Sequence, residues 1–366
     1  MGKILTGETY RPLWIAALAL LVLPFALQAV GLTLTSTTDV VIFAIAAMGL
    51  NLLVGYTGLT SFGHGAWFGL GSYAAALSQK YWFTGQIVLP LLFSLAFVAA
   101  LAALVGFLIL RRRGVYFSLL TLALSALTFA IAFRWTAFTG GESGLGGIVR
   151  PAVGPLNLEN PAVYLALVSL IGFAVLYVLL RVTRSPFGHV IVAIRENEQR
   201  ALFQGYDTQK YKLGVFVLSA TVTGLAGALL VFHHRIASAE PTSVAFSGEL
   251  LAIVVIGGMR SVLGPALGAL FSGAIPSSVS RMKRCAAANA MLVASAVLPM
   301  PGRPARIVRS LLCSPPILAL MPSRPVVTPD RCPPEFKARS ACLIASWLAS
   351  PKLLTLLSLP PSSATR

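Results

Sequence analysis

The sequence is poor in charged residues. Lys, Arg, Asp and Glu make up 11% of its 366 residues, whereas 57% are apolar and the mean hydropathy is +0.83. This balance lies far outside the range of ordinary soluble domains. It excludes a water-soluble fold for most of the chain and predicts an all-α polytopic membrane protein, at least up to about residue 270.

Cysteine is absent from the first 273 residues, and the four cysteines are Cys285, Cys313, Cys332 and Cys342. They form no CxxC pair and have no histidine among them, so no zinc or redox signature arises and disulfides are not indicated. The sequence also lacks a catalytic constellation and a Gly-x-x-x-x-Gly-Lys-Ser/Thr loop for nucleotide. We therefore expect no enzyme, and no metal or cofactor bound by this chain.

Long charge-free runs are plentiful. A helix of about 20 apolar residues spans a bilayer, and the runs 13–38, 87–110, 115–133, 161–180 and 213–232 each suit one helix. The run 40–79 is about twice too long for one crossing and contains several glycines, so we expect two helices with an irregular middle. Residues 250–275 form an eighth element, broken near Arg260, for which a hairpin is one interpretation. The first run has the alternative of a cleaved signal peptide, but its length favours a span.

The distribution of Lys and Arg predicts the orientation, because basic residues gather in cytoplasmic loops. A cytoplasmic N-terminus places eleven basic residues inside and four outside, with Arg260 unassigned. The inner set is Lys3, Arg11, Arg111, Arg112, Arg113, Arg181, Arg184, Arg195, Arg200, Lys210 and Lys212. The outer set is Lys80, Arg134, Arg150 and Arg235.

The last 93 residues differ from the rest. They hold 14 of the 23 prolines, and 12 basic residues against 2 acidic ones, so most of the net charge of +17 belongs to them and does not indicate nucleic acid binding. We predict a transmembrane domain over residues 1–273 and an irregular Pro/Arg-rich tail over 274–366. The tail is either a disordered basic extension in the cytosol or the translation of a shifted reading frame. Its composition without apolar periodicity favours the second.

The segment between the sixth and seventh spans, residues 182–212, is polar and long. Ser185 can cap a helix that begins at Pro186, and Gly205 can end a later one. Val190, Ile191 and Ile194 can face one way while the charged side chains face the other, as in an amphipathic helix along the membrane surface. A solvated loop is the alternative, but it is usually shorter. A capped helical loop is better suited to docking a cytosolic partner.

This segment resembles the coupling loop of permease subunits in bacterial ATP-binding-cassette importers of the branched-chain amino acid type. The stretch S-P-F-G-x-x-x-x-A-I-R-E-N-E begins at Ser185 and is followed by Gly205 and Tyr211-Lys212-Leu213. Further matching blocks lie at residues 49–58, 61–65, 113–117, 139–145, 257–259 and 263–265. The resemblance extends from about residue 40 to residue 273, and its several ordered blocks make it specific.

The resemblance implies a permease in the bacterial plasma (inner) membrane that moves branched-chain, hydrophobic amino acids inward. Its implied partners are a second permease subunit, two cytosolic subunits that bind and hydrolyse ATP, and a periplasmic substrate-binding protein. The residues that it implies for coupling to the ATPase are Ser185, Pro186, Phe187, Gly188, Ala193, Ile194, Arg195, Glu196, Asn197, Glu198 and Gly205. The loop Gly140–Gly144, predicted on the outer face, is either a flexible loop or a contact for the binding protein.

Alternatives remain for the function. Related permeases take up urea or short amides. An ion-coupled secondary transporter usually needs an ionisable residue at mid-membrane, and the predicted spans offer only His64 and Arg260. After residue 265 the family continues with apolar helices whereas this sequence turns to prolines and arginines, so an inactive permease is a further alternative.

The glycine-rich stretch from Gly55 to Gly71 is the expected pathway element, because irregular backbone can meet a zwitterionic substrate. Close helix packing through small residues is an equal and compatible interpretation. The predicted path residues are Asn51, Gly55, Tyr56, Gly58, Ser61, Gly63, His64 and Gly65. For His64 a bond to a neighbouring helix is favoured over a contact with substrate or a proton. His233 and His234 are expected at the membrane interface, with no acidic or cysteine partner nearby for a metal.

Overall fold

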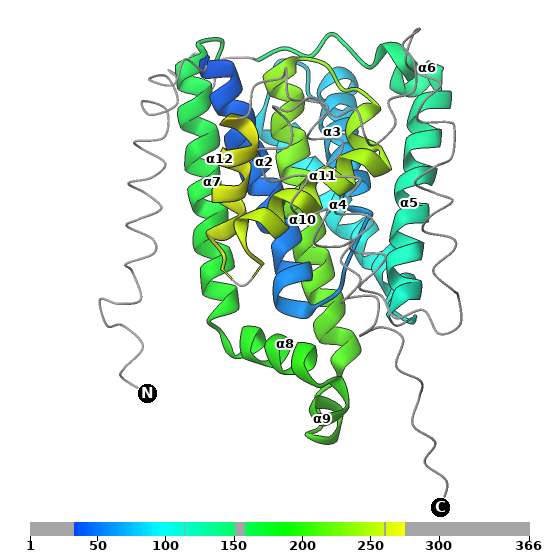
Figure 1. The fold of residues 1–366 in the computed structure, drawn as a ribbon. Coiled ribbons are helices and arrows are strands. Elements are labelled where there is room, and N and C mark those ends of the chain that lie inside the picture. Colours follow the sequence, from blue (N-terminus) through cyan, green and yellow to red (C-terminus); the bar gives the residue numbers. More distant parts are fainter. Residues whose placement is uncertain (1–32, 113, 151–157, 260, 275–366) are drawn as a thin grey trace, which may run out of the picture. The chain divides into compact units, whose positions relative to one another are not determined.

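A computed structural model describes residues 33–112, 114–150, 158–259 and 261–274. The chain divides into two units, residues 1–299 and 300–366, and every described residue belongs to the first. The described part is built from helices and contains no strand (Figure 1). Its elements are α2 (Leu34–Asn51), η2 (Leu52–Tyr56), α3 (His64–Tyr81), α4 (Val88–Ile109), α5 (Val115–Arg134), α6 (Thr136–Thr139), η3 (Gly141–Ser143), α7 (Pro161–Thr183), α8 (Pro186–Glu196), α9 (Glu198–Phe203), α10 (Thr208–His234), η4 (Glu240–Thr242), α11 (Val244–Gly257) and α12 (Gly264–Ala274).

Five helices in the described part are long and apolar enough to cross a membrane. They are α2 continued by η2, then α4, α5, α7 and α10. The central part of each is free of charge, because a charged side chain at the centre of a span costs roughly 2.5–3.5 kcal/mol on insertion scales, and charged residues such as Asp39 and Lys212 lie near the helix ends. The predicted all-α polytopic membrane fold is therefore confirmed.

The expected first span lies mostly outside the described residues. Its predicted end at Thr38 is wrong, because residues 34–38 form the first turns of α2. Thr33 caps this helix: its side chain accepts a hydrogen bond from the backbone N–H of Ser36. The charge-free run 13–38 continues past Thr33, so hydropathy alone gives no sign that a new helix begins there.

Helix α10 is the centre of the packing and contacts α2, α3 and α4 (Figure 1). Glycines allow the close approach of α3 and α10. A Cβ added to Gly71 would overlap the backbone of Gly224, and one added to Gly227 would overlap the carbonyl oxygen of Phe68. Small residues that bring helix backbones together are typical of membrane proteins, where dispersion forces between helices replace the hydrophobic effect.

The stretch 40–79 forms two helices with an irregular middle, as the sequence predicts. Helix α2 changes to the wider π-helix η2 at Leu52, the chain then leaves helical geometry, and α3 begins at His64. The turn after η2 contains Gly58 at φ 73°, in the left-handed region that favours glycine. Residues 61–63 of the break are buried, where irregular backbone within a membrane protein is tolerated, whereas Gly58 is exposed.

The last described elements, α11 and α12, form a hairpin, which confirms one interpretation of the sequence. A Cβ added to Gly257 would overlap Gly264, and one added to Gly268 would overlap the carbonyl oxygen of Ile253. Helix α11 begins at Val244, before the predicted start of this element at residue 250, because Ser243 caps it by accepting from Phe246 N–H. Both helices also pack against α2.

The basic residues of the described part gather at two opposite ends of the helices, as predicted. At one end, α7 leads into α8, and Gly106 near the end of α4 lies against Leu213 at the start of α10.

At the other end, Leu145 pairs with Ala237 through two backbone hydrogen bonds of 2.8 and 3.0 Å. This pairing holds the loop that contains residues 140–144, so the loop is anchored to the segment after α10.

Candidate functional site

Helix α8 begins as the sequence predicts. Ser185 is its N-cap: the Oγ accepts from the N–H of Gly188 at 3.4 Å and donates to the carbonyl of Val182 at 2.6 Å. Pro186 occupies the first helical position, where its missing N–H costs nothing. In Figure 1 the helix runs between the lower ends of α7 and α10.

Packing fixes α8 against the spans on either side of it. A Cβ added to Gly188 would overlap the carbonyl of Thr183 at the end of α7. The ring of Phe187 stacks on Tyr211 of α10, with centroids 5.4 Å apart. Ile191 and Ile194 are buried, whereas Ala193 is exposed. The expected amphipathic helix is therefore present, with its apolar face toward the protein.

The polar half of the loop forms a second short helix, α9. Asn197 separates the two helices, and its Oδ1 accepts from the N–H of Arg200 at 3.0 Å. Glu198 forms an ion pair of 2.8 Å with Lys212 of α10, and this pair is largely shielded from solvent. Gly205, at φ 87°, follows the end of α9 as predicted. The whole segment is thus a folded element, and Glu196 on its surface is exposed.

Arg195 connects α8 to the break after α2. Its guanidinium donates to the carbonyl of Gly55 within η2. Its alkyl chain lies beside Gly58, where an added Cβ would be 3.0 Å from Cγ of Arg195. A predicted coupling residue and two predicted path residues, 140 and 137 positions away in sequence, are therefore in direct contact.

Residues of η2 in turn contact the hairpin of α11 and α12. A Cβ added to Gly55 would overlap the carbonyl oxygen of Met259. The side-chain amide of Asn51 donates to the carbonyl of Ser261 at 2.9 Å, while its Oδ1 is buried and makes no hydrogen bond within the described part of the chain. A continuous series of contacts therefore extends from α8 through η2 to the tip of the hairpin.

His64 lies in a buried polar row. Its Nδ1 is 3.0 Å from Oγ of Ser61, and its Nε2 is 2.8 Å from Oγ of Ser219 on α10. Ser219 also donates to the carbonyl of Gly49 at 2.6 Å. Both ring nitrogens are thus engaged by serines, in agreement with the favoured interpretation of a histidine bonded to a neighbouring helix.

The remaining path residues are packed closely. A Cβ added to Gly63 would lie 2.5 Å from the carbonyl oxygen of Thr121. A Cβ added to Gly65 would lie 2.6 Å from Oγ of Ser247. Ser247 accepts from the N–H of Gly65 at 2.9 Å. The small-residue interpretation of this stretch therefore holds, and a role in the substrate path stays a prediction.

Two cavities lie near these elements. The smaller, about 360 Å³, is at the end of the bundle near α8. Its lining consists of Tyr56, Leu180, Thr183, Arg184, Ser261, Val262 and Leu263. Tyr56 is thus a predicted path residue that borders an open space.

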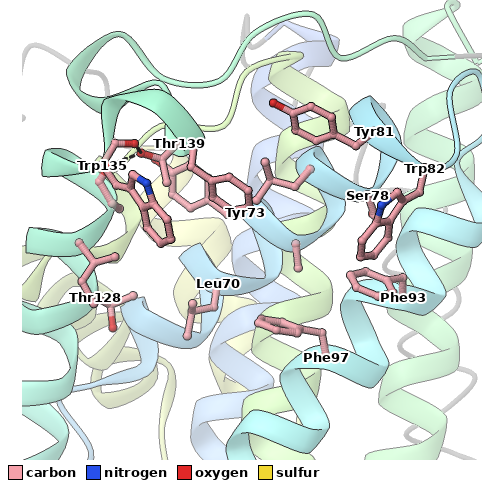
Figure 2. A pocket seen from close by; sticks show the side chains of 15 residues that line it. Leu70, Tyr73, Ser78, Tyr81, Trp82, Phe93, Phe97, Thr128, Trp135 and Thr139 are labelled. Atoms are coloured by element: carbon pink, nitrogen blue, oxygen red, sulfur yellow. Dashed lines mark hydrogen bonds between the residues drawn. The ribbon is translucent and has the colours of Figure 1, made fainter.

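The larger cavity, about 560 Å³, lies between α3, α4, α5 and α6 (Figure 2). Aromatic rings such as those of Tyr81 and Trp82 dominate its wall. The hydroxyls of Ser78, Thr128 and Thr139 in the lining already donate to backbone carbonyls. This space suits an apolar group and offers little to the two charges of an amino acid.

Sequence reasoning missed the partners of these residues. Ser219 and Ser247 bond to predicted path residues through their hydroxyls, whereas Ser261 accepts from Asn51 through its backbone carbonyl, which no side-chain pattern could indicate. A serine within an apolar run was the available signal, because a buried hydroxyl in a membrane needs a partner.

Comparison with known sequences supports a transport family. The sequence model of the family described as "Branched-chain amino acid transport system / permease component" matches residues 32–299. The chain is 30% identical to the high-affinity branched-chain amino acid transport system permease protein LivM of Escherichia coli, over 72% of this chain and 68% of the relative. It is 31% identical to LivM of Salmonella typhimurium, over 64% of this chain and 60% of that relative.

A more distant relative is the probable branched-chain amino acid transport permease protein LivH of Methanocaldococcus jannaschii, with 26% identity over 70% of this chain and 83% of the relative. The chain therefore spans between 60% and 83% of the length of these three relatives. No solved structure matches the chain.

Proposed function

The chain belongs to the family of permease components of branched-chain amino acid transport systems, and we propose that it is one permease subunit of an ATP-driven importer in a bacterial plasma membrane. Its substrates are aliphatic, branched-chain amino acids. Its partners are a second, different permease subunit, two cytosolic ATP-binding subunits and a periplasmic binding protein. ATP is bound and hydrolysed on the partner subunits.

The observation that carries this proposal is the contact of Arg195 on α8 with Gly55 in η2. In the proposed importer the ATP-binding subunits hold α8 and α9, whose charged surface is exposed. Closure of the ATPase dimer displaces α8 as a rigid body, because its cap, its aromatic stacking and Gly188 fix it to α7 and α10. Arg195 passes this displacement to the carbonyl of Gly55.

The π-helix is the element that responds. A π-turn inside an α-helix is rare and less regular than the helix around it, and such turns occur frequently at functional sites. A shift of η2 moves the hairpin tip, because Gly55 lies against Met259 and Asn51 bonds to the carbonyl of Ser261. The segment from Asn51 to Gly65 and the hairpin thus form the gate between the two sides of the membrane.

The state of His64 supports ATP coupling over ion coupling. Both of its ring nitrogens are engaged by serine hydroxyls and the side chain is fully buried. A proton-coupled site needs an ionisable group that water or substrate reaches during the cycle. The other residue considered for this role, Arg260, lies outside the described residues.

Uptake in proteoliposomes tests the proposal. The chain is reconstituted with its partner permease and ATP-binding subunits, and radiolabelled leucine is followed with the binding protein outside and ATP inside. We expect uptake only when both are present, and none with a non-hydrolysable ATP analogue. Uptake without ATP that responds to a proton or sodium gradient would reject the importer mechanism.

A further inference from the structure

We propose that Asp39 of α2 and His233 and His234 of α10 form a binding site for a Zn²⁺ ion, at the end of the bundle opposite α8. No acidic residue adjoins the histidine pair in the sequence, and Asp39 is 194 residues away from His233. The structure removes that objection, since the carboxylate of Asp39 lies against both rings. This site is independent of the proposed transport function.

The two distances from Asp39 to the histidines match the ligand spacing of a tetrahedral zinc site. Oδ1 of Asp39 is 3.6 Å from Nε2 of His233 and 3.1 Å from Nε2 of His234. One ligand atom from each of the three residues lies within 4.8 Å of the other two. Zinc ligands at about 2.0–2.1 Å in a tetrahedron are separated by about 3.3 Å, which falls between the two measured values.

Oδ1 of Asp39 and the ring nitrogens of His233 are buried, whereas His234 reaches solvent. His233 is 5% exposed, and its ring nitrogens, near the backbone of Thr35 and the carboxylate of Asp39, make no hydrogen bond of normal geometry in the described part of the chain. Oδ1 of Asp39 is also buried, and its polar neighbours are the two imidazoles, at 3.1 and 3.6 Å. A buried polar atom without a partner costs about 1–3 kcal/mol, and a bound ion is one of the recognised reasons for such an atom. The cluster faces inward at His233 and is open to solvent at His234, which is 43% exposed as a side chain.

The surroundings order the ligands. The ring of His233 stacks on Tyr164 with centroids 5.6 Å apart, and the hydroxyl of Tyr164 donates to the carbonyl of Leu229 at 2.6 Å. The stacked ring limits rotation of the His233 side chain, and the bond of Tyr164 to Leu229 holds the stacking partner in place. With three protein ligands the fourth position is left to water, as in open zinc sites.

Two cations near the site limit its affinity. Arg150 donates to the carbonyls of Phe232 and His233, and its guanidinium lies 4.7 Å above the Tyr164 ring. Arg235 follows His234 directly in the sequence. Asp39 supplies the one negative side chain among the ligands, and the C-terminal end of α10 adds a partial negative charge. We therefore expect binding weaker than that of a closed structural zinc site.

Zinc binding to the purified chain in lipid nanodiscs tests the site. All variants carry Ser in place of the four cysteines, because thiolates bind zinc, and the purification tag is removed. The parent is expected to bind about one Zn²⁺ per chain by calorimetry. Asp39→Asn, His233→Gln and His234→Gln are each expected to weaken binding at least about 10-fold, whereas His189→Gln on α8 should change it less than about 2-fold.

X-ray absorption of the zinc-loaded parent supplies the second measurement, with two imidazole nitrogens and carboxylate or water oxygens expected around the ion. Thermal unfolding without zinc shows that each variant is folded, and only folded variants are compared. No zinc bound to the parent, or binding that is equal in the three variants and the His189 control, would overturn the assignment.

Discussion

At the scale of single residues, glycines decide how closely the central helices approach. Gly71 and Gly227 lie where α3 and α10 touch through their backbones. In such a contact an added methyl group has no flexible side chain to displace, because the atoms that it meets belong to the main chain. The whole helix must then move, and overpacking of this kind typically costs about 1–3 kcal/mol.

We predict that Gly227→Ala lowers the stability of the permease by about this amount, because the new Cβ overlaps the carbonyl oxygen of Phe68. A drop in the apparent unfolding temperature of the detergent-solubilised chain measures the effect. The control is Gly248→Ala in α11, where an added Cβ meets nothing within 4 Å. It is expected to be neutral or slightly stabilising, since Ala favours a helix over Gly. Equal losses in both variants would contradict the packing explanation.

The sequence predicts some of the buried residues at these helix contacts, but it leaves their role open. The sequence predicts that the glycines between residues 55 and 71 serve the path, close packing or both, and the structure shows the packing. His64 was expected to bond to a neighbouring helix, and it meets Ser219 of α10. The identity of such partners is not predictable from one sequence, because it depends on the rotation of each helix about its axis, and evenly apolar helices leave that rotation open.

At the scale of elements, α8 and η2 act together. The caps of the coupling segment follow from local chemistry, and the sequence predicted both Ser185 and Gly205 correctly. The break at Asn197 and the change to π-geometry at Leu52 were not predicted. The first depends on a side chain that caps the next helix, and the second on tertiary contacts that override local helix propensity.

Arg195→Ala is predicted to uncouple transport. The variant keeps the cap and the apolar face of α8, so the ATP-binding subunits should still co-purify with it. Without the bond to Gly55 the motion of α8 is passed on less completely, and we expect leucine taken up per ATP hydrolysed to fall at least about 5-fold. Arg200→Ala, an exposed arginine on α9, is the matched control and should keep the ratio. A loss of ATPase association in the Arg195 variant, with an unchanged ratio, would instead assign Arg195 to docking.

At the scale of the whole molecule, the described helices separate the basic residues into two groups. Arg111, Arg112 and the coupling segment lie at one end, and Lys80, Arg134 and Arg150 lie at the other. Composition was sufficient to predict this division, because each charge-free run connects the two ends once, except residues 40–79, which form two helices. The family match to residue 299 extends past residue 273, where the resemblance seen in the sequence stopped.

The orientation of these two ends decides whether α8 can meet an ATPase, because ATP is available only on the cytoplasmic side. In a chain whose four cysteines are replaced by serine, Phe203→Cys places a thiol on α9 at a position that is 88% exposed. Glu142→Cys places one on η3, at the opposite end. A membrane-impermeant maleimide added to right-side-out vesicles is expected to label the position-142 thiol and to leave the position-203 thiol unlabelled until the vesicles are opened.

Labelling of both variants in detergent is the control for reactivity. The reverse pattern would place α8 and α9 outside, where no nucleotide is hydrolysed. It would remove the physical basis for ATP coupling through Arg195, while the helix packing and the cluster at Asp39 would stand. Agreement with the expected pattern makes the charge distribution and the coupling contact two consequences of one topology, since both require the segment from Pro186 to Phe203 to lie in the cytoplasm.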